Sequence, residues 1–205
     1  GTNLLYVFDT AQIVCGLCAI YRKSRNGLYL DAARKAGAFI LESQESGGAF
    51  KPIYNRRIHA WVIRDETYRI WNGPFSGLMC KVTEALDELY QVTSEKRYYE
   101  TMLRAADYYQ DAVYLKHSHP LGYWLEGLYA VGWSDRVRDV MECHILERIY
   151  KNGFIDYIDQ ENYAYVSGSM QIGILLWKLG YRKEAEQIRD YGRKVQSHEI
   201  GRASC

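Results

Sequence analysis

The sequence predicts an all-α protein built from consecutive helix pairs, and three observations support this prediction. Apolar residues recur three and four positions apart along several segments, which is the spacing of one buried helix face. A helix-turn-helix segment near the start of the chain repeats further along it at a constant offset. The chain of 205 residues contains only 3 Pro, as expected of a mostly helical protein, because Pro breaks helices.

The repeated segment consists of an apolar helix, a polar turn and a second helix that begins near a Tyr. We expect the first helix over residues 10–23 and the second over residues 29–43, with a turn at 24–27 in which Gly27 takes a positive φ. The equivalent positions of the two copies are Leu17, Ile20, Tyr21, Tyr29, Ala36 and Phe39, and Leu86, Leu89, Tyr90, Tyr98, Ala105 and Tyr108.

Two further helix pairs follow, which brings the total to about four. Their helices are expected over residues 124–131 and 135–150, and over residues 167–179 and 183–195. Ser134 or Asp135 is a suitable N-cap for the second of these helices. In each pair the first helix is richer in apolar and small residues, which predicts an inner helix shielded on both sides and an outer helix with one solvated face.

One stretch, residues 48–74, departs from the helical pattern. β-branched and aromatic residues at 58–63 and 68–71 flank a polar turn at 64–67, and this pattern predicts a small β-hairpin within residues 55–71. We expect the hairpin to lie over one end of the helical array. Because no low-complexity linker divides the chain, residues 1–205 are expected to form a single domain.

The overall composition argues against nucleic acid and membranes as partners. A formal net charge of +1 gives no field that would draw the chain to nucleic acid or to a membrane surface. No apolar run approaches the roughly 18 residues of a membrane span. No signal peptide opens the chain, so a cytoplasmic location is expected.

The sequence contains 5 Cys and 19 Tyr. Cys15 and Cys18 form a CxxC motif inside an apolar helical run, which favours two small buried residues over a redox or zinc site. No metal site and no cofactor are therefore expected. The many Tyr are suited to the half-buried walls of a wet cavity, although they could equally fill helix interfaces.

Three segments resemble recurring blocks of bacterial and archaeal proteins associated with polysaccharide biosynthesis, of the VpsJ type. They are residues 7–17 (VFDTAQIVCGL), 119–128 (HPLGYWLEGL) and 163–172 (YAYVSGSMQI). The helix pairs with Gly-rich returns also resemble the (α/α) toroids of terpenoid cyclases, polysaccharide lyases and glucuronyl hydrolases. No Asp-rich cyclase motif and no Cys/His/Asp zinc set is present in the sequence, which disfavours the terpenoid cyclases of the protonating type and the zinc-dependent toroid enzymes.

This resemblance implies an (α/α) toroid or a partial toroid, because four pairs fall short of the six of a closed toroid. Either the chain is a fragment of a longer toroid, or it forms an open arc, or it closes by oligomerising. An open arc would expose apolar surface of its inner helices, which monomers avoid, so we favour self-association as a homodimer.

The resemblance also implies that the starts of the inner helices meet around a cavity. As catalytic candidates we select Asp9 and Glu126, a carboxylate pair suited to glycosidic cleavage, and His119 and Tyr123, a base and acid suited to uronate lyase or epimerase chemistry. Arg64 would then neutralise the uronate. The remaining substrate-binding candidates, which could stack on sugar rings or pair with hydroxyls, are Gln12, His59, Trp61, Trp71, Trp124, Tyr163 and Gln171.

Most of these candidates also have a structural interpretation. Asp9 could be a helix N-cap or first-turn acid, and Glu126 could complement a helix dipole. His119 could bond local backbone at a helix entry, while His59 and Trp61 could fasten the hairpin to the helices.

The sequence thus predicts a carbohydrate-related protein that acts on or binds a bacterial polysaccharide or a uronate-containing glycan. If the protein is an enzyme, it would be a glycoside hydrolase, a polysaccharide lyase or a sugar epimerase. This hypothesis places Asp9, His119, Glu126 and Tyr163 within about 10 Å of one another in a groove. The alternative is a non-catalytic helical-repeat module for interaction or self-assembly.

Overall fold

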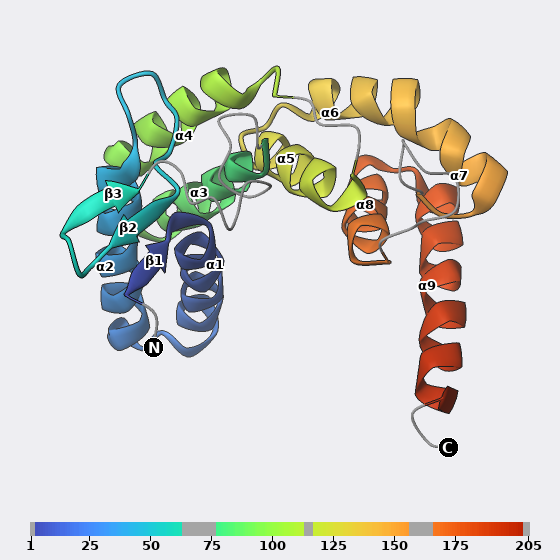
Figure 1. The fold of residues 1–205 in the computed structure, drawn as a ribbon, viewed down its shortest axis with the longest axis horizontal. Helices are drawn as coiled ribbons and strands as arrows, with labels where there is room; N and C mark the ends of the chain where they lie inside the picture. Colours follow the sequence, from blue (N-terminus) through green and yellow to red (C-terminus); the bar gives the residue numbers. More distant parts are fainter. Residues whose placement is uncertain (1–2, 63–76, 113–116, 156–165, 203–205) are drawn as a thin grey trace.

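The computed structural model describes residues 3–62, 77–112, 117–155 and 166–202, and shows an arc of helix pairs (Figure 1). The inner, concave side is formed by α1 (Val7–Ser24), α3 (Val82–Thr93), α5 (Ser118–Ala130) and α8 (Val166–Leu179). The outer side is formed by α2 (Gly27–Ser43), α4 (Lys96–Tyr109), α6 (Ser134–Val140), α7 (Leu146–Asn152) and α9 (Arg182–Arg202). The predicted all-α fold of four helix pairs is confirmed. No helix in the described ranges combines the length and the apolar character needed to cross a membrane.

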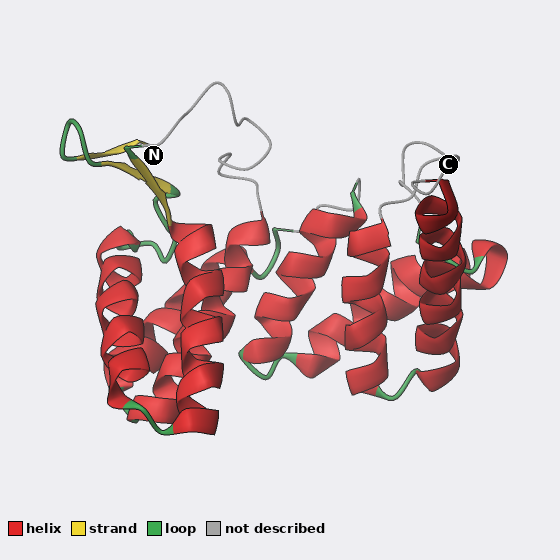
Figure 2. Cartoon of the chain, turned by 90° about the horizontal axis from the view of Figure 1, so that it is seen from below, coloured by secondary structure: helices red, strands yellow, loops and turns green. Residues whose placement is uncertain are grey.

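Successive inner helices pack side by side, and each also packs against the outer helix of its own pair. The α1–α2, α5–α6 and α8–α9 turns lie along the same rim of the arc, so these inner helices begin at the opposite rim (Figure 2). The starts of these inner helices therefore lie along one rim of the concave side.

The α1–α2 turn differs in detail from the expectation. Arg25, not Gly27, has the positive φ, 57°, and its N–H donates to the Tyr21 carbonyl at 2.8 Å. The side chain of Asn26 accepts from Leu28 N at 3.0 Å and caps α2, so Gly27 is already the first helical residue. The cap fixes where the second helix starts, and this leaves the left-handed position to Arg25.

The outer helix expected over residues 135–150 is interrupted. A π-helical turn, η3 (Met141–Ile145), separates α6 from α7. The N-cap residue of α6 is Trp133, and Ser134 is the first helical residue. Extra residues in a helical turn shift the buried face, and here Met141 and Ile145 are both buried.

A three-stranded antiparallel sheet lies at the end where α1 begins (Figure 2). It consists of β1 (Leu4–Tyr6), β2 (Ile53–Asn55) and β3 (Ala60–Val62). A hairpin lies in this region, as expected, and its turn is at 56–59 between β2 and β3. The expected turn at 64–67 and the second expected strand at 68–71 fall outside the described residues.

Aromatic packing explains the position of the hairpin. Tyr54 pairs with Trp61 across β2 and β3, and the Trp61 ring stacks on Phe39 of α2 with a centroid distance of 5.3 Å. Val7 N, at the start of α1, donates to the Pro52 carbonyl at 2.9 Å. The sheet is therefore held between an outer helix and the start of an inner helix.

The middle of the arc depends on a close approach of α5 to the 3₁₀ helix η2 (Gly77–Lys81), which leads into α3. Gly127 of α5 lies directly against the backbone carbonyl of Cys80, and a Cβ at this position would overlap that oxygen. The Thr83 hydroxyl is 2.7 Å from the Cys80 carbonyl oxygen and 2.8 Å from the Gly127 carbonyl oxygen. Because Cys80 contributes backbone here, the clash could not be relieved by a rotamer change.

The loop before β2 is tied to α5 through two aromatic residues. Phe50 N donates to the Tyr109 hydroxyl at 3.0 Å, and Trp124 Nε1 donates to the Tyr109 carbonyl at 2.7 Å. Trp124 is only 1% exposed. Burial also raises the pKa of the Tyr109 phenol, and the hydrogen bond from Phe50 opposes this effect.

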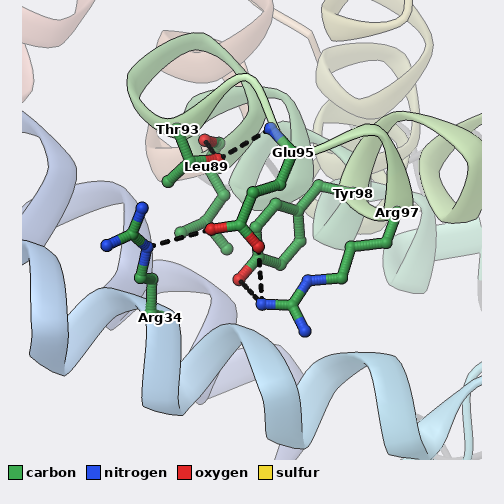
Figure 3. Close-up of polar contacts among 6 residues, drawn as sticks. All are labelled: Arg34, Leu89, Thr93, Glu95, Arg97 and Tyr98. Carbon is green, nitrogen blue, oxygen red and sulfur yellow. Dashed lines mark hydrogen bonds and ion pairs between the residues drawn. The ribbon is translucent and has the colours of Figure 1, made fainter.

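The α3–α4 turn is fastened to α2 by Glu95 (Figure 3). One carboxylate oxygen accepts from Arg34 Nε at 3.0 Å, and the other lies 2.6 Å from Arg97 Nη2. Glu95 N donates to the Thr93 hydroxyl at 3.2 Å. This cluster joins the second helix pair to the first.

We expect Gly127→Ala to lower the free energy of unfolding by about 1–3 kcal/mol, because the added methyl group overpacks a rigid backbone contact. Gly16→Ala is the matched control, since Gly16 also lies within an inner helix but a Cβ added there would have no atom within 4 Å. That change should stabilise the protein by about 0.5–1 kcal/mol. Urea unfolding of both variants measures the difference, and equal effects would contradict the packing argument.

Candidate functional site

The candidate site begins as a row of three polar side chains on α5. His119, Tyr123 and Glu126 follow one another at spacings of four and three residues, so they share one helix face. The rings of His119 and Tyr123 lie 4.5 Å apart between centroids. The ring of Phe8, at the start of α1, packs edge-on against Tyr123 at 4.8 Å. The first turn of α1 therefore meets this row.

Asp9 follows Phe8 in the first turn of α1 and is exposed. The negative charge of Asp9 affects the pKa of the Tyr123 phenol. Burial raises the pKa of the Tyr123 phenol, the carboxylates of Glu126 and Asp9 raise it further, and the Lys81 ammonium opposes them. Tyr123 therefore keeps its proton at neutral pH and is suited to donating a hydrogen bond or a proton.

Lys81 is the functional candidate that the sequence interpretation missed. It ends η2, and only 8% of its side chain is exposed. Its ammonium pairs with the Glu84 carboxylate and lies 2.8 Å from Glu126 Oε2. Burial lowers the pKa of Lys81, but both carboxylates raise it and the net direction is upward. A single Lys within an otherwise apolar run, residues 77–82, was the available sign of a buried charge.

Two glutamines on the neighbouring inner helices carry polar atoms that are buried without a hydrogen-bond partner in the described parts of the chain. They are Nε2 of Gln12 and Oε1 of Gln171. Gln12 lies one turn after Phe8 on the same side of α1, and Gln171 Nε2 donates to Glu126 Oε2 at 3.2 Å. Buried polar atoms are nearly always paired, so a donor and an acceptor of this kind are what a polar ligand or a water would satisfy.

The start of α5 is capped by a second histidine. His117 Nδ1 accepts from His119 N at 3.2 Å, and burial together with the neighbouring His119 lowers the pKa of His117. His117 therefore acts as a neutral acceptor at neutral pH, which orients the helix start that carries His119.

Several predicted binding residues do not join this site. Trp124 points into the core, so the expectation that it stacks on a sugar ring was wrong. Trp61 packs against Phe39 and Tyr54, which agrees with its structural interpretation. His59 is exposed in the hairpin turn, and no contact fastens it to the helices in the described residues. Arg64, Trp71 and Tyr163 lie outside the described residues.

The CxxC motif has no sign of redox chemistry. Cys15 and Cys18 are free thiols, and burial is the main cause that raises the pKa of Cys15 to about 12 and that of Cys18 to about 11. Burial also raises the pKa of Cys80. Within the described ranges, no group of three or more His, Cys, Asp or Glu side chains could hold a metal ion.

The chain is similar in structure to the cellobiose 2-epimerase of Bacillus thermoamylovorans B4167, with a TM-score of 0.66 and 17% sequence identity. The similarity covers 94% of this chain and 61% of that enzyme, so the chain spans about three fifths of its length. The fold is of the (α/α) toroid type, with four helix pairs in the described residues. No protein-family model matches the sequence, and no curated protein matches it.

We expect the thiols of the native protein to differ in their rate of alkylation. At about pH 8, iodoacetamide should modify the exposed Cys143 readily, whereas Cys15, Cys18 and Cys80 should react only after unfolding, because a raised pKa leaves little thiolate. Peptide mapping by mass spectrometry with and without denaturant measures this difference. Labelling of Cys15 or Cys18 as fast as that of Cys143 would point to a reactive CxxC motif.

Proposed function

We propose that the concave face binds a carbohydrate around Tyr123, with Asp9, His119 and Glu126 as the groups that contact it. The observation that carries this proposal is that groups of two inner helices act on one phenol: the rings of Phe8 on α1 and His119 on α5 contact Tyr123, and the carboxylates of Glu126 and Asp9 raise its pKa. A polar set beside aromatic rings is suited to a sugar, which offers both hydroxyl groups and an apolar ring face.

Two likenesses support the choice of a sugar as the ligand. The fold resembles that of an enzyme whose name gives cellobiose as its substrate. The three sequence blocks described above resemble polysaccharide-biosynthesis proteins, which favours a bacterial polysaccharide as the source of that sugar.

The chemistry of the site is compatible with proton transfer. Tyr123 keeps its proton and donates, while an ion-paired carboxylate such as Glu126 accepts. An epimerase needs a base that takes a proton from a sugar carbon and an acid that returns one. His119 and Tyr123, whose ring centroids lie 4.5 Å apart, are the candidate pair for this chemistry, and Asp9 and Glu126 are the candidate pair for hydrolysis.

The charges of the described residues favour a neutral sugar over a uronate. The carboxylates of Asp9, Glu84 and Glu126 outnumber the single ammonium of Lys81, so a further carboxylate on the ligand would be repelled. Arg64, which the sequence interpretation paired with a uronate, lies outside the described residues.

A second candidate function is a non-catalytic interaction module. It is favoured by an apolar groove of about 410 Å³ between α8 and α9, whose lining includes Met170, Ile174, Trp177 and Ile188. Ile174 is 53% exposed and Trp177 is 46% exposed. This groove lies on the C-terminal edge of the arc and contains none of the residues around Tyr123.

Calorimetric titration with cellobiose and with a uronate disaccharide tests the sugar proposal. We expect cellobiose to bind, and Glu126→Gln and Asp9→Asn each to weaken binding by about tenfold or more, because each removes a charged acceptor. Glu100→Gln is the control, since Glu100 is an exposed carboxylate on the outer helix α4. Equal affinity in all variants, or no binding of either sugar, would favour the interaction module.

A further inference from the structure

Lys81 occupies a position that is unfavourable for a cation in two ways. It is the residue immediately before α3, where the helix dipole repels positive charge, and it is 6% exposed, so its ammonium has lost most of its hydration. Glu84, in the first turn of α3, and Glu126, on α5, compensate both effects. Replacement of such an ion group by apolar residues is often neutral or stabilising, so stability alone is a weak explanation for Lys81.

Lys81 and Gln171 contact the same oxygen atom. Lys81 Nζ is 2.8 Å from Glu126 Oε2, and Gln171 Nε2 donates to that oxygen at 3.2 Å. The two donors come from different elements, η2 and α8, on either side of α5. One carboxylate oxygen is thus fixed from two directions.

The Gln171 side chain is itself held in place by the helix that carries Glu126. Gly122 of α5 leaves room for it, since a Cβ added at Gly122 would lie 3.1 Å from the Cβ of Gln171. The α5–α8 contact therefore determines where the Gln171 amide can reach. An amide confined in this way holds a hydrogen-bond partner with little loss of entropy.

The second oxygen of Glu126 is left available. Within the described part of the chain, both the ion pair and the hydrogen bond of Glu126 end on Oε2, and 15% of the side chain is exposed. Tyr123 lies one turn before Glu126 on the same helix face, and it keeps its phenolic proton. An acceptor oxygen and a donor hydroxyl thus lie next to each other on the concave side.

We propose that Lys81 and Gln171 are positioning residues, which hold Oε2 of Glu126 so that Oε1 accepts a hydrogen bond from a sugar hydroxyl. This inference rests on the proposed carbohydrate binding. It adds the two residues, Lys81 and Gln171, that fix the orientation of the Glu126 carboxylate. Lys81 is not an amine nucleophile in this arrangement, because its two carboxylate partners keep it protonated. Its effect on the ligand passes through Glu126.

A double-mutant cycle with cellobiose tests this route. Lys81→Met should weaken cellobiose binding by about tenfold in the wild-type background but by less than about twofold in a Glu126→Gln background, since the group being positioned is then already altered. Gln171→Met should behave in the same way, and Lys81→Arg should recover most of the affinity. Equal losses in both backgrounds would show that Lys81 acts independently of Glu126 and would overturn the inference.

The matched control is Arg22→Met, which removes the ion pair between Arg22 of α1 and Glu88 of α3, away from the site. Binding by this variant should stay within about twofold of the wild type. A loss as large as that of Lys81→Met would indicate that any broken ion pair on α3 disturbs binding, and it would overturn the positioning role. Gln171→Met carries no charge change, so it keeps the test valid if Lys81→Met does not fold.

Crystal structures of the wild type, Lys81→Met and Gln171→Met give a readout that needs no sugar. We expect the Glu126 carboxylate to change its side-chain torsion angles when either donor is removed. An unchanged Glu126 conformer in both variants would overturn the inference. If the wild type binds no cellobiose while Glu126 does reorient in the variants, the proposed function fails for this sugar and the positioning of Glu126 stands.

Discussion

The close approach of α5 to η2 is the constraint on which both the fold and the candidate site depend. Gly127 packs against the backbone of Cys80 at the centre of the arc. The residues immediately before and after that contact are Glu126 and Lys81, and they form the ion pair of the site. A larger residue at 127 would force α5 away from η2 and separate the carboxylate from its ammonium. The packing of the inner helices therefore sets the geometry of the polar groups that they carry.

The helices could be predicted from the sequence because each inner helix repeats its apolar spacing over several turns, as in α1 and α3. Local details could not, because they depend on particular contacts. The side chain of Asn26 caps α2 and moves the positive φ to Arg25. The hairpin packs on α2 through the stacking of Trp61 on Phe39, two residues that are distant in the sequence. No local pattern around residues 53–62 contains that information.

Part of the site could be anticipated by a similar argument. If inner helices start along the same rim of an arc, polar residues in their first turns lie near one another. On this basis we selected Asp9, His119 and Tyr123. Trp124 directly follows Tyr123 in the sequence but lies on another face of α5, where Gly77 and Tyr109 enclose it. The apolar run around Lys81 indicates that this residue is buried, but its pairing with Glu126 follows from the packing of α5 across η2 and could not be read from the sequence.

The arrangement around Glu126 also explains why a buried charge can persist in an otherwise apolar helix junction. The cost of desolvating Lys81 is offset by two carboxylates, and the excess negative charge that they bring remains on the concave side. A module that only bound an apolar partner would gain nothing from this excess, whereas a sugar hydroxyl needs a fixed acceptor. The apolar groove between α8 and α9 lies elsewhere on the arc. The polar cluster and the groove are therefore separate features, and it is the polar cluster that the packing of the inner helices holds in place.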